Sequence, residues 1–268
     1  MPPIRLAVMA SAPLYDLWST GTVHPDLVEV NTWMSIEEVR LYHQLLPAEP
    51  LLIHGGNLLG ADLTEAQAEF LAMLVKEAAA PWVSAHISLW PWKILQEARQ
   101  RGRQPTALDL GSHLEGFFTR VRMLRELLGV PLLLENAPGL PGWSNDPESD
   151  PVTIASVLEA TGCNFLLDLS YAQTAAGNWG YTPEEYLERL PLGRAVEVHL
   201  SAPGRMGDGN WMDVHDPLRE QDYYLLGWLL EQVTPQVVTL EYWKEPHAIA
   251  EQLQRLKSEL SRERMIGN

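Results

Sequence analysis

Eight short apolar runs recur along the chain, separated by segments long enough to hold a helix. The residues after most of them have helical periodicity, so the spacing is too wide for hairpins and typical of a parallel sheet. Eight such units in 268 residues suit one (β/α)8 barrel. The runs occupy residues 4–10, 26–32, 51–56, 82–89, 131–136, 164–169, 195–200 and 236–241. We therefore expect an α/β protein whose residues 1–268 form a single TIM-barrel domain.

Start signals support the helices between these runs. Ser35 with Glu38, and Thr182 with Glu185, have the spacing of capping boxes. The expected helical segments are 35–46, 62–79, 108–128, 152–160, 182–190, 217–232 and 246–264. The connection between the first two runs shows little helical character, so we expect an irregular segment there.

Composition excludes several classes of protein. Hydrophobic residues make up 46% and charged residues 20% of the chain, which suits a globule with a sizeable core. Lys and Arg number 19 against 35 Asp and Glu, a net charge of -16 that disfavours nucleic acid and anionic membranes as partners. No signal peptide pattern and no apolar run of about 18 residues occurs, so we expect no membrane span. Cys163 is the only cysteine, which excludes a disulfide or a thiolate metal site within the chain and fits a reducing cytoplasm.

Polar residues recur at the carboxyl ends of six of the apolar runs. Active sites of parallel barrels lie at this end of the strands. One such residue is weak evidence, because a histidine in a strand is often structural and an acidic residue after a strand is often a helix cap. Together the six indicate a functional site: His54, His86, Glu135, Asp168, His199 and Glu241.

Asp213 and His215 add two candidates shortly after the seventh run. If their segment is extended, both side chains point the same way, because alternate residues share a face. A solvated polar loop with an incidental Asp-x-His is the alternative. Their occurrence with six similar residues favours a shared site.

These eight residues have the chemistry of a metal centre. Carboxylates and imidazoles converging in a barrel mouth would be repulsive and poorly solvated without cations. Four histidines and four carboxylates provide ligands for two metal ions at four each, or for two to three if Glu135 or Glu241 bridges and water fills open positions. Without sulfur ligands, iron, manganese and zinc all remain possible.

The segments that carry these residues resemble a known family. LLIHGG, WVSAHISLW, LLLENAP, FLLDLSYAQTAAGNWGYTPEEYL, AVEVHLSAPG, WMDVHD and VTLEYW are similar, in order, to motifs of the multinuclear non-heme iron-dependent oxidative enzymes of the methanobactin-maturase type. The resemblance covers residues 50 to 245 and implies a TIM barrel related to those of xylose isomerase and endonuclease IV. It also implies two or three iron ions, dioxygen as oxidant, Cys or Asp/Asn of a ribosomally made precursor peptide as substrate, and a partner protein that captures the peptide leader.

Residue by residue, the resemblance implies one ligand set and matches two neighbouring residues, Asn136 and Asn178. The implied ligands are His54, His86, Glu135, Asp168, His199, Asp213, His215 and Glu241. Dioxygen or water bound to the metals would be the reacting species, and five residues are expected to contact substrate or support the ligands: Asn136, Tyr171, Asn178, Trp179 and Trp211. The family usually has Asn three residues after the strand-six Asp, where this chain has Tyr171. A phenol is a poor ligand unless ionised, so a two-metal variant or a variant with changed or lost activity stays open beside the three-metal form.

Three functions therefore remain open from the sequence. The leading hypothesis is an iron-dependent oxidase or oxygenase of a peptide. The alternative is a divalent-metal-dependent hydrolase or isomerase acting on a sugar or phosphoester with zinc, manganese or magnesium, for which the same ligands would serve. A catalytically silent binding barrel is the third.

Overall fold

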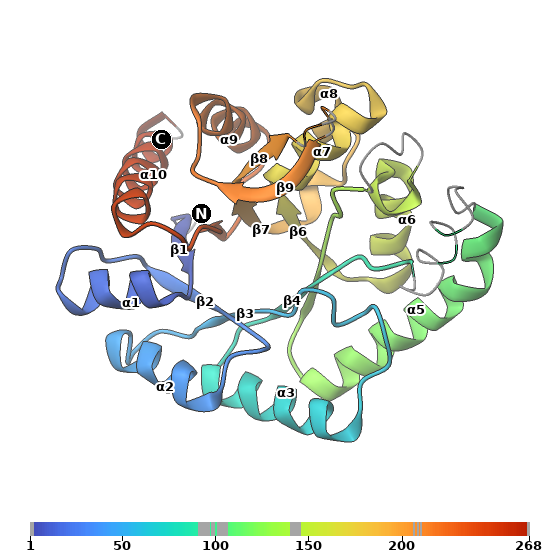
Figure 1. The fold of residues 1–268 in the computed structure, drawn as a ribbon, viewed down its shortest axis with the longest axis horizontal. Helices are drawn as coiled ribbons and strands as arrows, with labels where there is room; N and C mark the ends of the chain where they lie inside the picture. The colour runs from blue at the N-terminus through green and yellow to red at the C-terminus, as the bar shows by residue number, and fades with distance from the viewer. Residues whose placement is uncertain are drawn as a thin grey trace.

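A closed parallel barrel organises the structure, a computed structural model that describes residues 3–90, 97, 100, 107–139, 146–205, 207, 209 and 211–266. Within these residues, eight parallel strands close in the order β1-β10-β7-β6-β5-β4-β3-β2 (Figure 1). The strands are β1 (Arg5–Met9), β2 (Leu27–Asn31), β3 (Leu52–His54), β4 (Val83–His86), β5 (Leu132–Glu135), β6 (Asn164–Asp168), β7 (Ala195–Leu200) and β10 (Val237–Leu240). The predicted TIM barrel is confirmed.

Helices surround this barrel. They are α1 (Ala12–Ser19), α2 (Ile36–Leu45), α3 (Glu65–Ala78), α5 (Ala107–Leu128), α6 (Pro151–Thr161), α7 (Leu169–Trp179), α8 (Pro183–Leu187), α9 (Glu220–Gln232) and α10 (Pro246–Ile266), with short 3-10 turns at Pro147–Ser149 and Leu192–Arg194. The capping boxes at Ser35 and Thr182 are present at the starts of α2 and α8. None of the helices in the described part of the chain has the length and apolarity needed to cross a membrane.

Two helices differ from the sequence-based expectation. The first connection was expected to be irregular and this was wrong, because α1 lies there with Ser11 as its N-cap and Pro13 in its first turn, where proline is tolerated. Helix α7 follows β6 directly and uses Asp168 as its N-cap. The sequence analysis expected no helix between the end of this strand and residue 182.

Alternation along the strands divides the barrel interior into two levels. One buried apolar cluster lies inside the barrel: Ala7, Leu27, Leu52, Trp82, Leu133, Leu166 and Val237. Two residues further along a strand, side chains return to the same face. At that step β2 has Glu29, β3 His54 and β5 Glu135, all buried. The apolar level therefore supports a polar level at the carboxyl ends of the strands.

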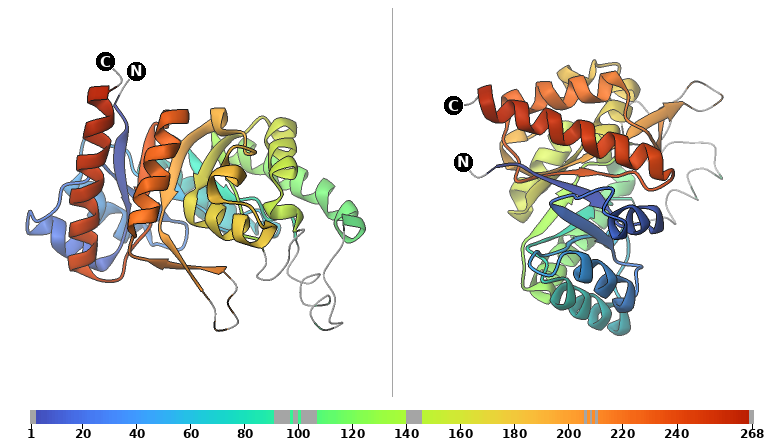
Figure 2. Two further views of the ribbon diagram at one scale, coloured as in Figure 1. Left: turned by 90° about the horizontal axis from the view of Figure 1, so that it is seen from above. Right: turned by 90° about the vertical axis from the view of Figure 1, so that its left-hand side faces the viewer.

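A two-stranded antiparallel hairpin follows β7. Its strands are β8 (Ala202–Arg205) and β9 (Trp211–Asp216). The hairpin lies beside α7 (Figure 1), and Gly177 of α7 faces the Trp211 indole closely. It projects from the end of the barrel opposite to the start of β1 and the end of α10 (Figure 2). The extended segment expected around Asp213 and His215 is thus strand β9.

Candidate metal centre

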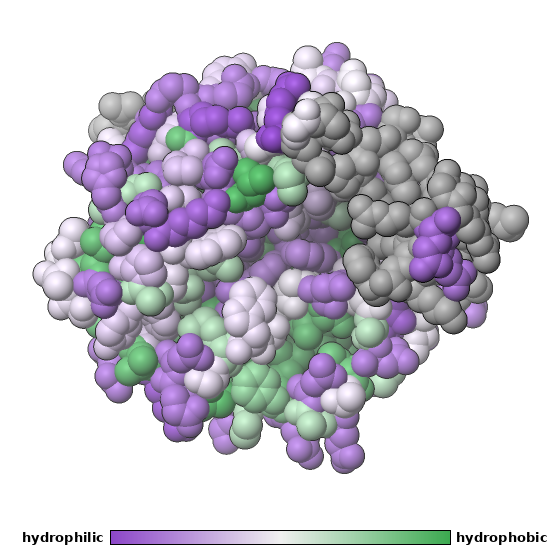
Figure 3. Space-filling model, viewed as in Figure 1, coloured by the Kyte–Doolittle hydropathy of each residue, from purple (hydrophilic) through white to green (hydrophobic). Residues whose placement is uncertain are grey.

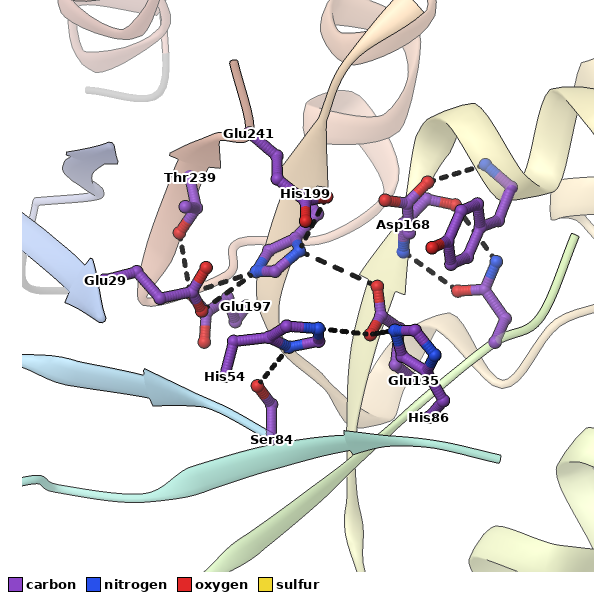
Figure 4. Close-up of polar contacts among 12 residues, drawn as sticks. Glu29, His54, Ser84, His86, Glu135, Asp168, Glu197, His199, Thr239 and Glu241 are labelled. Atoms are coloured by element: carbon purple, nitrogen blue, oxygen red, sulfur yellow. Dashed lines mark hydrogen bonds and ion pairs between the residues drawn. The ribbon is translucent and has the colours of Figure 1, made fainter. Parts of the chain in front are cut away.

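The polar level of the barrel gathers the residues singled out in the sequence. His54, His86 and Glu135 end β3, β4 and β5. Asp168 ends β6, and His199 lies one residue before the end of β7. Figure 4 shows these side chains turned toward one another, with Glu241 just after β10. Their arrangement follows from parallel strands of matched register, since Glu135 pairs with His86 and Asp168 pairs with His199 along the sheet.

Glu135 lies at the middle of the cluster. Its Oε2 is 3.1 Å from His86 Nε2 and 3.7 Å from His54 Nε2. Its Oε1 is 3.6 Å from His199 Nδ1 on the other side. One carboxylate therefore faces two groups of imidazoles, one through each oxygen.

Two overlapping groups around Glu135 have ligand atoms close enough to share an ion. One is His54, His86 and Glu135, and the other is Glu135, Asp168 and His199; in each group the ligand atoms lie within 4.8 Å of one another. Several of these atoms are buried and have no hydrogen-bond partner among the described residues: both oxygens of Glu135, Asp168 Oδ2 and His199 Nδ1. Unpaired buried acceptors are costly unless a cation is bound, so the donor set fits a metal.

Glu241 connects this cluster to the hairpin. Its Oε2 is 3.4 Å from His199 Nδ1 and 3.2 Å from His215 Nε2. His215 Nδ1 in turn lies 2.9 Å from Asp213 Oδ1. Asp213 and His215 thus border the centre beside Glu241. Simple alternation along a strand does not account for this, because His215 has a left-handed backbone with a φ of 48° and the pairing of β9 with β8 is irregular between Ala202 and Gly204.

Burial without cations shifts the protonation of these groups strongly. Burial lowers the pKa of His54 to about 4. Burial, and after it the charges of Glu135 and Glu241, raise the pKa of Asp168 well above its usual value. Burial also acts to lower the pKa of His215, but hydrogen bonds with Asp213 and Glu241 outweigh it and raise the value to about 10. Such opposed shifts in one cleft are typical of functional sites.

Hydrogen bonds from neighbouring residues fix two of the candidate ligands. Ser84 Oγ lies 2.9 Å from His54 Nδ1, so the Nε2 of that ring faces Glu135. Asn136 donates to the backbone oxygen of Asp168 at 3.0 Å and accepts from its backbone N–H at 2.9 Å. Supporting contacts of this kind orient metal ligands in proteins.

The sequence analysis missed two buried acidic residues of the barrel interior. Glu29 of β2 and Glu197 of β7 are both fully buried, and Glu29 Oε1 is 3.1 Å from His199 Nε2. Burial raises the pKa of Glu29 to about 8. Each residue was visible in the sequence as a lone acidic residue inside an apolar run, LVEVN or AVEVHL. The sequence analysis selected only residues at the strand ends.

The other residues expected near the site lie in different surroundings. The Tyr171 ring packs edge-on against His86 with centroids 5.8 Å apart, and burial raises the pKa of its phenol well above the usual value, which keeps it neutral. Asn178 Nδ2 is buried without a hydrogen-bond partner among the described residues. The indole of Trp179 donates to Ser149 Oγ, and that of Trp211 packs on Gly177.

A cavity of about 910 Å³ opens onto the centre. Its floor includes His54, His86 and Glu241, and its walls come mainly from the segments after β1 and β2. Apolar and aromatic wall residues are Met9, Pro13, Tyr15, Trp33, Met34 and Trp243. Figure 3 views the end of the barrel from which the hairpin projects and shows a hollow near the middle, with hydrophilic side chains in and around it. Among the residues expected to contact substrate, Tyr171 lines the cavity; Trp179 and Trp211 are not among its described lining residues.

Comparison with known proteins places the chain in a family. A family model described as "RiPP precursor modification enzyme MbnB/TglH/ChrH" matches residues 22–266. The chain belongs to this family. Its members are described as enzymes that modify the precursors of ribosomally made, post-translationally modified peptides, so the resemblance found in the sequence is confirmed.

Relatives of this RiPP-modifying family member align over part of their length. A UPF0276 protein of Caulobacter vibrioides is 25% identical over 170 residues, which cover 62% of this chain and 59% of that protein. A UPF0276 protein of Paraburkholderia phytofirmans is 29% identical over 134 residues, covering 48% and 44%. The alignments thus span less than two thirds of either relative.

Solved structures share the barrel. A D-tagatose 3-epimerase-like protein superposes with a TM-score of 0.68 at 16% identity, covering 99% of this chain and 100% of that one. Endonuclease IV from Thermus thermophilus gives 0.60 at 19% identity, covering 96% and 99%. A xylose isomerase-like TIM barrel protein from Mycobacterium smegmatis gives 0.57 at 15% identity, covering 97% of each. At these identities the likeness shows the fold alone.

Proposed function

We propose that this chain oxidises a residue of a ribosomally made peptide with dioxygen, using two or three iron ions held at the polar level of the barrel. Membership of the RiPP-modifying family supports the peptide substrate. The metal centre is supported by the convergence, on both sides of Glu135, of buried ligand atoms that lack a hydrogen-bond partner among the described residues.

Glu135 would bridge two ions. His54 and His86 would complete one site with Glu135 Oε2, and Asp168 and His199 would complete the other with Glu135 Oε1. Glu241 lies within reach of the second site through its contact with His199.

The number of metal ions would depend on Asp213 and His215 of β9. Asp213 and His215 border Glu241 and would either complete the second site or hold a third ion. Tyr171, which stays neutral beside His86, is a poor ligand and favours two ions.

Iron would supply dioxygen binding and one-electron transfer, whereas zinc or manganese would fit the same nitrogen and oxygen donors. The protein's own residues orient the ligands and exclude water. Ser84 and Asn136 hold His54 and Asp168 in place. The apolar walls of the cavity, including Met9 and Met34, would shield a bound Cys or Asp/Asn side chain from solvent.

The cavity is the proposed peptide site. Its volume of about 910 Å³ exceeds that of one side chain and suits a short segment. Asn31 lies in its wall, and its buried Oδ1, which has no partner among the residues that the structure describes, would accept a peptide N–H. Asp16 and Glu38 also line it and favour a cationic residue next to the modified one. A leader-binding partner protein would deliver the remaining length of the precursor.

The proposed compartment is the cytoplasm. Cys163 is buried and unpaired, and burial raises the pKa of its thiol, so it is suited neither to a disulfide nor to nucleophilic attack. A reducing compartment also suits a centre that must be loaded with ferrous iron.

A metal-dependent hydrolase or isomerase is the second candidate. The observation that favours it is the shared barrel with endonuclease IV and with sugar epimerase-like proteins. The net charge of -16 disfavours DNA as the substrate within this class. Zinc, manganese or magnesium in the centre would support this alternative.

Metal analysis separates the two candidates. Protein purified without oxygen from iron-supplemented cells should contain two or more iron ions per chain, measured by elemental analysis, and should give the visible and electron paramagnetic resonance signals of coupled non-heme iron. Zinc or manganese without iron would move the assignment to the hydrolase or isomerase class.

A double substitution tests the ligands. The double substitution His54→Ala with Glu135→Ala should abolish metal binding at the centre that Glu135 would bridge. The secondary structure, measured by circular dichroism, should be retained. His247→Ala with Glu251→Ala is the matched control, because this pair is likewise a His–Glu contact, at 3.1 Å against 3.7 Å for His54 and Glu135, but lies exposed on α10. Equal metal content in both double variants would rule out the ligand assignment.

A further inference from the structure

Glu29 is buried beside the metal centre but is absent from the expected ligand set. It lies in the middle of β2 and is fully buried. Its Oε1 is 3.1 Å from Nε2 of His199, which is also fully buried (Figure 4). A carboxylate on β2 thus meets an imidazole on β7 across the interior of the barrel.

The two nitrogens of His199 face different neighbours. Nδ1 lies 3.6 Å from Glu135 Oε1 and 3.4 Å from Glu241 Oε2, and it has no hydrogen-bond partner among the described residues. Nε2 points the other way, toward Glu29. Since a metal-binding imidazole carries its proton on the nitrogen away from the metal, Nδ1 is free to bind and Nε2–H is the donor.

A role for Glu29 as a ligand itself conflicts with these contacts. Glu29, His54 and His199 also lie within 4.8 Å of one another and could in principle hold an ion. That ion would need His54 Nε2, because Ser84 occupies Nδ1 of that ring. The same Nε2 faces Glu135, and one nitrogen cannot serve two metals. His199 Nε2 would also have to give up its proton.

A second buried carboxylate near His199, that of Glu197, is already engaged. Glu197 accepts from the Trp82 indole at 2.7 Å and from the Thr239 hydroxyl at 2.6 Å. Its nearer oxygen is 3.7 Å from His199 Nε2, beyond hydrogen-bond distance. Glu29 Oε2, by contrast, has no partner among the described residues. The contact with His199 is therefore the one hydrogen bond of the Glu29 side chain within the described part of the chain.

We infer that Glu29 is a positioning residue for the metal centre: it accepts the Nε2–H of His199 and so holds Nδ1 toward the site shared by Glu135 and Asp168. This inference rests on the metal centre proposed above. The carboxylate fixes the tautomer and the angle of the ring and makes Nδ1 a stronger donor to a cation.

Cobalt(II) is the probe for this role, because its visible d–d absorption reports coordination without any need for substrate. Metal-free wild type, Glu29→Gln and a control are titrated with Co²⁺ under anaerobic conditions. Glu29→Gln keeps the shape of the side chain and removes its charge, so the fold should persist, which thermal unfolding of the metal-free protein verifies. Asp222→Asn is the control: Asp222 is a similarly buried carboxylate in the first turn of α9, where it is held by Arg219 and by Gln173 of α7.

Glu29→Gln should bind the same number of Co²⁺ ions as wild type, one of them about 10- to 100-fold more weakly and with a shifted d–d band. Asp222→Asn should match wild type in both respects. Loss of one whole ion with the other unaltered would make Glu29 a ligand and overturn the inference, and so would unchanged affinity and spectrum. If wild type binds no Co²⁺, both the proposed metal centre and the role of Glu29 are wrong. If wild type binds Co²⁺ and Glu29→Gln binds it equally well, only the role of Glu29 is wrong and the proposed function stands.

Discussion

Gly177 and Trp211 form a close contact between α7 and the hairpin that carries Asp213 and His215. A Cβ built at Gly177 would lie 2.3 Å from Trp211 Cδ1 and 2.6 Å from Trp211 Nε1, closer than the 3.0 Å below which real Cβ contacts are essentially absent. The Arg205 guanidinium stacks 4.2 Å from the centre of the indole ring and so favours its present position on the hairpin. Gly177→Ala should therefore push the hairpin away from α7.

Two opposing effects set the size of the change in stability. Alanine is favoured over glycine inside a helix by up to about 1 kcal/mol. Overpacking at a rigid contact costs about 1 to 3 kcal/mol. We expect Gly177→Ala to lower the free energy of unfolding by about 0 to 2 kcal/mol in the wild-type background. In a Trp211→Ala background the indole is absent. There Gly177→Ala should raise the free energy of unfolding by up to about 1 kcal/mol.

A double-mutant cycle on metal-free protein measures this coupling. Urea unfolding of wild type, both single variants and the double variant gives an expected interaction energy of about 1 to 3 kcal/mol. Metal titration of the same proteins reports whether displacing the hairpin weakens binding at His215. An equal effect of Gly177→Ala in both backgrounds would refute the contact as the cause.

Three further changes give measurable outcomes. Asn136→Ala removes both hydrogen bonds to the Asp168 backbone and should lower the free energy of unfolding by about 1 to 3 kcal/mol; an unchanged urea midpoint would contradict this. Burial, and then the charge of Asp146, raise the pKa of Glu148 to about 8 from 4.5. The folded state therefore binds more protons than the unfolded state between these values, so stability should fall as pH rises from 4.5 to 8. Glu148→Gln should flatten that decline in thermal unfolding of metal-free protein, and an unaltered slope would disprove the link. Tyr171→Asn introduces the residue that the resemblance implies at this position and should add a third metal ion per chain by elemental analysis; an unchanged metal count would show that Tyr171 does not limit the third site.

Strand periodicity made the barrel predictable, and the absence of periodicity hid α7. Residues Leu169 to Ala176 of this helix are all buried, and none of its residues is charged. A helix that is covered on all sides has no polar face, so no 3.6-residue pattern appears in its sequence. The first helix, α1, was hidden differently: Pro13 in its first turn and Gly21 just beyond it resemble the signals of an irregular loop.

The candidate site was predictable where its residues end strands, and Glu29 was missed because it does not. Barrel geometry brings every strand end to one rim, so position alone grouped His54, His86 and Glu135. The partner of His199 depends instead on which residues of β2 and β7 meet across the interior, which requires the closed barrel. The metal ligands and the single domain over residues 1–268 stay predictions.

The two levels of the barrel interior act in opposite directions on folding. Leu27, Leu52 and Leu133 bury apolar area and favour the closed barrel, whereas the polar residues two positions further on must lose their hydration. Glu135 and Asp168 have buried oxygens without a hydrogen-bond partner in the described part of the chain, so their burial is unfavourable until a cation binds. A metal that binds this arrangement and not the unfolded chain stabilises the fold by about 4 kcal/mol at a thousand times its dissociation constant. The same carboxylates that weaken the metal-free barrel would thus couple its stability to metal loading.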